Sequence, residues 1–249
     1  MESMQALPHF GGKLMSAQVS TLLMRELKSG IFSNCKKLPS EMELANMLGV
    51  SRTVIRDSLS DIEREGFIER VRGIGTVINR SVVNMTHRLD LKLEYSDLIR
   101  EGGHIPHTDL LHVSLVSASE HIAAALGIKS GATLIKCDKR ILANNIPVIY
   151  SSDYLSAEMF SGIELHEINW SEPIFDILER CCGLTVATDV TEITPVIGPA
   201  EIRRMLNCSN ENALLKMEER SYSRPTHPVL YSISYYTEFF NFKILRKKF

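Results

Sequence analysis

Residues 38–78 constrain the fold of this chain more than any other stretch, because two short helical patterns there are joined by a tight turn. Ser40 and Glu43 have the spacing of a capping box, which predicts a helix that begins after Ser40 and ends at Gly49. Ser51 is typical of the residue that caps the next helix. Two helices joined by a short turn that contains glycine form a helix-turn-helix.

A short basic hairpin is expected directly after these helices. Residues 67–72 and 76–78 have the composition of two strands, and residues 73–75 supply a glycine loop between them. Apolar residues also recur at helical spacing from residue 16 to Gly30, which predicts a further helix upstream. Three helices and a hairpin make a winged helix-turn-helix, a unit that reads the major groove of duplex DNA.

The start of the second helix of this motif has the chemistry of DNA contact. Arg52 and Arg56 lie one turn apart, and arginine can make two parallel hydrogen bonds to guanine, worth roughly 1–3 kcal/mol of discrimination. Ser51 and Thr53 can donate to phosphates. Arg72 suits a wing that approaches the minor groove. The alternative is an ordinary three-helix module with surface arginines.

Composition limits how such contact could be made. The formal net charge is −2 and the first 80 residues are only mildly basic, so DNA contact must come from placed cations. No apolar run is long enough to span a membrane, and we expect no signal peptide. The five cysteines lack CxxC spacing, which favours reduced thiols and a cytoplasmic location. Cys181 and Cys182 are adjacent, so a redox role for them stays open.

The second half of the chain alternates between strand and helix patterns. Residues 81–93 resemble a connector, which gives expected domains at 1–80 and 94–249. The fold class is therefore α+β, with an antiparallel sheet in the second domain. The expected strands lie near 110–116, 133–142, 147–155, 185–196, 213–222, 229–237 and 240–246, and the expected helices near 94–101, 119–126, 173–182 and 199–207.

A short internal repeat lies within this half. A shift of 81 residues superimposes the segment PVIYS, which starts at Pro147, on PVLYS, which starts at Pro228. The same shift superimposes Lys139 on Arg220, so these cations are expected to be quasi-equivalent. A duplicated hairpin predicts a sheet built from two related halves with a cleft between them.

The first 80 residues resemble a known family. LPSE, ELA, GVSRTVIRDSL and GFIERVRGIGT are similar to the DNA-binding half of the GntR family of bacterial repressors, over about residues 14–80. Many members carry arginine where this chain has Met42, so we expect one contact to be lost here. The resemblance, with the motif chemistry, implies these DNA-binding residues: Ser40, Ser51, Arg52, Thr53, Arg56, Arg72 and Gly73.

The remainder resembles one branch of that family. Its strand content disfavours the branch with an all-helical effector domain, some members of which hold a metal. The strand–helix order, the NNIP turn and the closing FNFKILRKK are similar to the HutC-type effector domain, called UTRA, whose fold resembles that of chorismate lyase. This resemblance covers roughly residues 90–249 and implies a ligand-binding domain.

The UTRA resemblance implies a small-molecule pocket with polar positions. Lys139 stands where an arginine is common and Arg220 is its second-half counterpart, whereas Ile141 replaces a common arginine and Ser151 a common glutamate. We expect a less polar effector with one acidic group, paired by Lys139 or Arg220; release from the operator by a micromolar hexosamine phosphate would contradict this. The alternative is that both cations form surface salt bridges. The expected effector-binding residues are Tyr95, Ser96, Lys139, Ile141, Ser151, Phe175 and Arg220.

These expectations define a homodimeric, effector-responsive regulator, most simply a repressor that a ligand releases from an inverted-repeat operator. We expect no catalytic residue, metal site or cofactor. The histidines at 104, 107, 112 and 121 do not have the spacing of a ligand set. A lyase with a DNA-binding head and a constitutive DNA-binding module are the rival interpretations.

Overall fold

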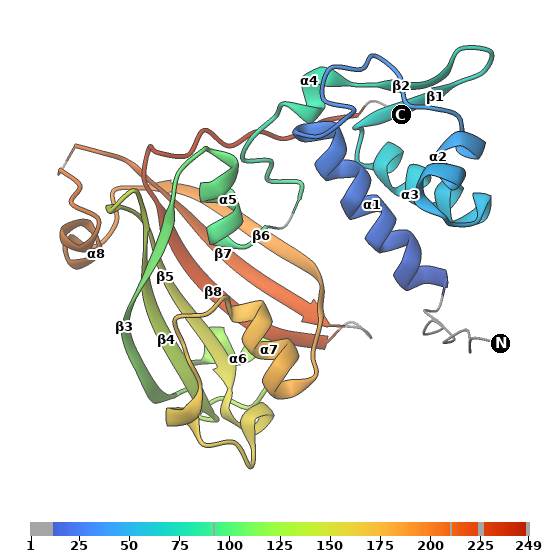
Figure 1. Cartoon of the computed structure of the whole chain (residues 1–249). Helices are drawn as coiled ribbons and strands as arrows, with labels where there is room; N and C mark the ends of the chain where they lie inside the picture. Colours follow the sequence, from blue (N-terminus) through green and yellow to red (C-terminus); the bar gives the residue numbers. More distant parts are fainter. Residues whose placement is uncertain (1–11, 92, 210, 224–226, 248–249) are drawn as a thin grey trace. The chain divides into compact units, whose positions relative to one another are not determined.

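The computed structural model describes residues 12–91, 93–209, 211–223 and 227–247. The chain divides into two compact units: Met1–Met85 together with Leu245–Phe249, and Thr86–Ile244. Residues 245–247 thus group with the first unit, whereas the sequence predicted a single second domain over residues 94–249. Figure 1 shows the elements of each unit.

The first unit has the helix-turn-helix and hairpin expected from the sequence. Helix α2 has the predicted capping box at Ser40, and its left-handed C-cap at Gly49 lets the chain turn at once into α3, capped by Ser51. Five elements make up this part of the unit: α1 Gly12–Lys28, α2 Glu41–Leu48, α3 Arg52–Arg64, β1 Ile68–Val71 and β2 Gly75–Ile78.

The second unit is built on a six-stranded antiparallel sheet with the order β3-β4-β5-β8-β7-β6 (Figure 1). The α+β class predicted from the sequence is therefore confirmed. The strands are β3 Pro106–Ser117, β4 Thr133–Ala143, β5 Ile146–Ser156, β6 Val186–Val196, β7 Leu214–Ser223 and β8 His227–Tyr236.

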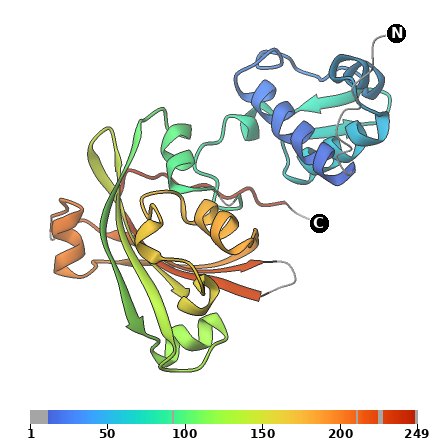
Figure 2. The ribbon, with the colours of Figure 1, turned by 60° about the horizontal axis from the view of Figure 1, so that its bottom comes forward.

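Helices pack on both faces of this sheet. On one face α7 lies across the strands (Figures 1 and 2), and Ile177 and Leu178 of this helix pack with Ile135 and Leu155 of the sheet. Helix α5 packs on the same face through Ile99. Helices α6 and α8 cover parts of the opposite face. The helical elements are α4 Arg80–Val83, α5 Tyr95–Glu101, α6 Glu120–Leu126, α7 Ile174–Cys182, α8 Ala200–Met205 and the 3-10 turns η1 Ala157–Phe160 and η2 Leu165–Glu167.

The two halves of the sheet meet where β5 pairs with β8. Ser152 pairs with Ile233, and these are residues that the repeat superimposes, so a local pseudo-twofold axis passes between them. The repeat therefore describes the β5–β8 pair correctly.

The repeat does not hold one strand further out on each side. Lys139 lies opposite Ser151, but the repeat equivalent of Ser151 is Ser232, which lies opposite Glu219. The structural counterpart of Lys139 is thus Glu219 and not Arg220. A shift of one residue along a strand moves a side chain to the other face of the sheet, so the expected equivalence of Lys139 and Arg220 is wrong.

One expected strand is also wrong. Residues 240–246 form no strand and contribute a single bridge, between Lys243 and Arg88. Phe240 packs into the core beside α5 and Tyr236, so the apolar residues of this segment are used for packing rather than for strand pairing.

Candidate nucleic-acid interface and effector pocket

The two arginines at the start of α3 point away from the core. The side chains of Arg52 and Arg56 are 62% and 59% exposed. The opposite face of α3 is anchored by Ile55, Leu59 and Ile62, which are fully or almost fully buried. The helix therefore holds the two guanidinium groups on one exposed surface, as major-groove recognition requires.

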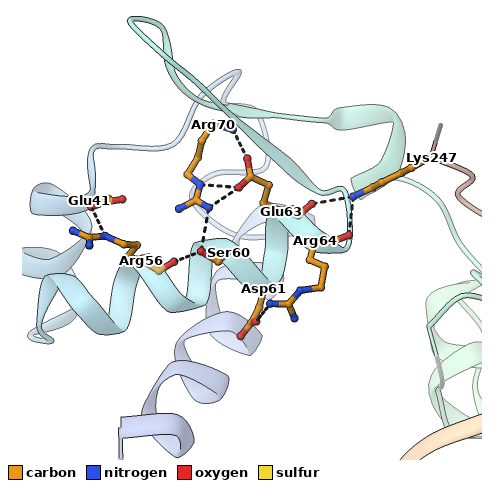
Figure 3. Close-up of polar contacts among 8 residues, drawn as sticks. All are labelled: Glu41, Arg56, Ser60, Asp61, Glu63, Arg64, Arg70 and Lys247. Carbon is orange, nitrogen blue, oxygen red and sulfur yellow. Dashed lines mark hydrogen bonds and ion pairs between the residues drawn. The ribbon is translucent and has the colours of Figure 1, made fainter. Parts of the chain in front are cut away.

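A carboxylate lies near both arginines. Glu41 Oε2, on α2, lies 3.9 Å from Arg52 Nη2. The same oxygen lies 3.7 Å from Arg56 Nε (Figure 3). Both distances exceed that of a hydrogen bond, and exposed ion pairs of this kind contribute little. The two arginines thus lie near Glu41 but are not held by a hydrogen bond to it.

The serines and the threonine of the motif differ in what they can still donate. The hydroxyl of Ser40 donates to Glu43 Oε2 at 2.7 Å, so its proton is used inside the capping box. Ser51 Oγ accepts from the backbone N–H of Val54, which leaves its own O–H free to donate. Thr53 is exposed. Ser51 and Thr53 are therefore better placed than Ser40 to donate to a phosphate.

The wing ends in an exposed turn at Arg72, Gly73 and Ile74. Gly73 has φ of 76°, in the left-handed region, and a Cβ placed on it would have no atom within 4 Å. Glycine is therefore favoured here by the backbone conformation and not by a close neighbour. Lys37 Nζ donates to the carbonyl of Ile74 at 3.1 Å, which fixes the loop at the wing tip.

Arg70 and Glu63 connect the wing to α3 and were not singled out by the sequence. The Glu63 carboxylate accepts from the backbone N–H and the guanidinium of Arg70, and Arg70 also donates to Ser60 Oγ at 3.0 Å (Figure 3). Burial alone raises the pKa of Glu63, but the bonds from Arg70 outweigh burial and hold that pKa below its usual value. Charge patterning does not reveal this pair, because its members lie in different elements.

A cavity of about 370 Å³ lies in the second unit and is lined in part by expected effector residues. Tyr95, Ser96, Lys139 and Ile141 line it. Charged groups and apolar surface share its wall, and the remaining lining residues are Glu94, Arg100, Pro106, His107, Thr108, Asp153, Ser171, Glu172, Pro173 and Ile174.

Three expected effector residues lie outside this wall. Ser151 is buried behind it and contacts the hydroxyl of Tyr95 at 3.1 Å. The backbone N–H of Phe175 donates to Glu94, while its side chain packs against the core beneath α7. Arg220 lies on the opposite sheet face from Lys139 and donates to Glu192 at 2.8 Å. The surface salt-bridge alternative therefore describes Arg220, whereas Lys139 is buried.

Other features of the described residues add little to the site. No group of three or more His, Cys, Asp or Glu residues there is arranged to hold a metal ion. Burial raises the pKa of Cys182 to about 11, so its thiol is poorly ionised at neutral pH. None of the described helices is both long and apolar enough to cross a membrane.

Comparison with known proteins gives two family matches. The model of the UTRA domain matches residues 101–238, and the model described as "Bacterial regulatory proteins, gntR family" matches residues 15–78. The "HTH-type transcriptional repressor NagR" of Bacillus subtilis is 26% identical over 205 residues, 82% of this chain and 83% of that protein. The "Histidine utilization repressor" of Pseudomonas putida is 23% identical over 211 residues, 83% of this chain and 82% of that protein.

Solved structures resemble the fold over most of the chain. YydK from Bacillus subtilis, titled a possible transcriptional regulator, has a TM-score of 0.70 at 16% identity, covering 94% of this chain and 99% of its own. PhnF from Mycobacterium smegmatis has a TM-score of 0.59 at 20% identity, with the same coverage of both chains. At these identities the likeness concerns the fold alone.

Proposed function

This chain belongs to the GntR family of bacterial regulatory proteins and carries a UTRA domain, and on that premise we propose that it is a repressor released from its operator by a small-molecule effector. That it is a transcription regulator follows from the family. The repressor action, the inverted-repeat operator and the release by ligand are the proposed parts. We also propose that it acts in the cytoplasm, without catalytic activity or a cofactor.

The exposed arginine pair on α3 is the observation that carries this proposal. Arg52 and Arg56 stand one turn apart at the start of a helix whose opposite face is buried. Arginine in this position can bind guanine O6 and N7 in the major groove. The exposed wing turn at Arg72 and Gly73 supplies a second contact on the same unit. We infer that Ser51 and Thr53 bind the flanking phosphates.

A homodimer is proposed because a twofold protein matches a twofold operator. Strand β3 lies at an edge of the sheet, so one side of its backbone has no strand partner among the residues that the structure describes. Three apolar side chains on it are exposed: Leu110, Leu111 and Leu115. Together they form an apolar strip that a second copy of the chain would cover.

The cavity beside α5 and α7 is the proposed effector site. It is lined by Tyr95, Ser96, Lys139 and Ile141, and Ser151 supports Tyr95 from behind. An acidic group on the effector would pair with Lys139. Arg220 is not included, because its side chain is on the opposite face of the sheet.

Two measurements test the proposed function. Purified protein is mixed with duplex DNA from upstream of its own gene, and a mobility shift against an unrelated duplex of equal length reports specific binding. Candidate effectors are then added to the complex. Specific binding that a small molecule reverses is the expected result; affinity equal to that for the unrelated duplex would rule out the proposal.

A further inference from the structure

The cavity wall holds one buried cation and one buried anion that come from neighbouring strands. Lys139 on β4 is 3% exposed and Asp153 on β5 is 1% exposed, and both line the cavity. Lys139 lies opposite Ser151, and Asp153 lies opposite Cys137, so the two charges are diagonal neighbours on one face of the sheet. Backbones in that relation are about 7–8 Å apart.

One oxygen of Asp153 is fully used and the other is not. Oδ1 accepts from Ser232 Oγ at 2.7 Å and from Ser151 Oγ at 3.2 Å. Oδ2 is buried and has no hydrogen-bond partner among the described residues. A buried carboxylate oxygen without a donor is costly, so this atom calls for a donor from outside the chain.

The nearby hydroxyl groups cannot supply that donor without breaking another bond. Ser151 donates to Asp153 Oδ1, Ser234 donates to Ser151 at 3.1 Å, and the Tyr95 hydroxyl lies 2.8 Å from Ser234. Burial, with the nearby charge of Asp153, raises the pKa of Tyr95 well above its usual value, so this hydroxyl keeps its proton. Because the proton of Ser234 is directed at Ser151, the contact between Tyr95 and Ser234 uses the proton of Tyr95. The protons in this series of hydrogen bonds are therefore all directed toward Asp153 Oδ1.

Lys139 has the complementary requirement. Its ammonium group donates to the neutral carbonyl oxygen of Glu172 at 2.8 Å. Within the ranges that the structure describes it has no carboxylate partner, and it does not pair with Asp153 either. A buried ammonium group with two remaining donors is best satisfied by an anion.

We propose that the effector carries both a protonated primary amine and an acidic group, with the amine bound by Asp153 Oδ2 and the acid bound by Lys139. This inference rests on the proposed function, since it takes the cavity as the effector site. It replaces the less polar effector expected from the sequence, because the buried Asp153 adds a second charge to the cavity wall. An amine is favoured over a hydroxyl group because a charged donor also compensates the charge of the carboxylate.

The probes are ω-amino carboxylates from glycine through β-alanine and γ-aminobutyrate to ε-aminocaproate. Each is paired with the alkanoate that lacks the amine and the alkylamine that lacks the acid. Ligand-observed NMR on the full-length protein detects millimolar binding. We expect at least one amino carboxylate to bind about tenfold or more tightly than both of its partners. The diagonal placement of the charges favours the longer members.

The variants Asp153→Asn and Lys139→Met identify the atoms that bind. Asparagine keeps an oxygen for the two serines but replaces Oδ2 with an amide group that repels an ammonium ion. We expect either variant to lose the advantage of the amino carboxylate, while the melting temperature of Asp153→Asn stays the same or rises, since a buried charge is removed.

Asp138→Asn and Lys136→Met are the matched controls. These residues pair with each other at 2.8 Å on the opposite face of the same strand. They should keep the binding preference of the unmodified protein. Equal binding of amino carboxylate and alkanoate, no binding by any member of the series, or full binding by Asp153→Asn would each overturn the inference.

The operator assay separates this failure from that of the proposed function. The same protein is tested for specific DNA binding without any probe. Specific DNA binding together with ligand binding that does not require the amine would contradict the inference and leave the proposed function standing. Loss of specific DNA binding removes the proposed function, whatever the NMR shows.

Discussion

Arg52 and Arg56 share the carboxylate of Glu41, at distances too long for hydrogen bonds. An operator would compete for the same guanidinium groups, and a guanine edge offers two acceptors where Glu41 offers one distant oxygen. The phosphates of DNA would also be repelled by Glu41. We therefore expect these three side chains together to set both the strength and the specificity of DNA binding.

Replacement of Arg52 by alanine should reduce the affinity for the operator by roughly 1–3 kcal/mol, because a two-bond contact to guanine is lost. Fluorescence anisotropy with labelled operator measures this, and circular dichroism checks that the helix content is unchanged. Arg64→Ala is the control, since Arg64 lies in the last turn of α3 and pairs with Asp61. Equal losses in both variants would show a general charge effect instead.

Glu41→Gln should have the opposite effect and tighten DNA binding. The substitution removes a negative charge beside both arginines and so removes repulsion of the phosphates. The gain should be largest at low salt, because exposed charges are screened as salt rises. Titrations at two salt concentrations measure it, with Glu201→Gln in the second unit as control. A weaker complex would mean that Glu41 positions the arginines.

At this scale the sequence predicted the exposed arginines of α3 that we propose contact DNA, because their chemistry and spacing lie within one helix. It did not identify Asp153, whose importance depends on burial and on serines from two strands. It also placed Arg220 with Lys139, because a repeat in sequence cannot show a one-residue difference in register. The environment of Asp153 and the register of Arg220 both depend on how the strands pair in the folded protein.

Helix α3 is held at its carboxyl end by two other elements. Arg70 of the wing is bonded to Glu63, and Lys247 Nζ donates to the carbonyl oxygens of Glu63 and Arg64 at 3.1 and 2.7 Å (Figure 3). The carbonyl of Glu63 also accepts from the backbone N–H of Gly66 at 2.9 Å, just beyond the helix, and a cation at this end is favoured by the helix dipole. Wing, helix and chain end thus form one connected group within the first unit.

Acidification should weaken the link between the wing and α3. The pKa of Glu63 is lower in the folded protein than its usual value of 4.5, so its contribution to stability is present above pH 4.5 and is lost as the pH falls through the folded value. Glu63→Gln should therefore flatten the fall in melting temperature below pH 4.5. Glu158→Gln, at an exposed turn of the second unit, should leave that fall unchanged. Identical curves for Glu63→Gln and the unmodified protein would refute the link.

Lys247→Ala should loosen the last turn of α3. The loss of the cation at the helix end should cost about 0.3–1 kcal/mol. Hydrogen–deuterium exchange of the amides at the end of α3 should become faster, while the amides of α1 should not change. Arg246→Ala is the control, because it removes a neighbouring exposed charge. No difference between the two variants would show that the contact contributes nothing.

At the scale of elements, caps and periodicity predicted most of the fold. Ser40, Ser51 and Gly49 marked the helix-turn-helix because each satisfies backbone groups locally. The prediction of a strand at residues 240–246 was wrong because apolar spacing does not distinguish strand pairing from packing beside α5. The contact of Lys247 with α3 could not be predicted either, since Lys247 lies far from α3 in sequence.

For the whole molecule, we propose that two copies read one operator. We expect light scattering to give the mass of a dimer for the unmodified protein. Leu115→Glu on β3 should shift the mass toward a monomer, because a charge would be buried in the apolar strip. Glu120→Gln, outside the strip, should remain dimeric. A monomer before any substitution would contradict the dimer, and a persistent dimer in Leu115→Glu would place the interface elsewhere.

Dimethyl sulfate protection of guanine N7 tests the account most directly, because this atom lies in the major groove and is the acceptor assigned to the arginines. The duplex comes from upstream of the protein's own gene. We predict two clusters of protected guanines, about one helical turn apart or a multiple of it. The protection should disappear when Arg52 and Arg56 are replaced by alanine. Specific binding without N7 protection, or protection that survives the double substitution, would contradict the assignment of α3 as the reading helix.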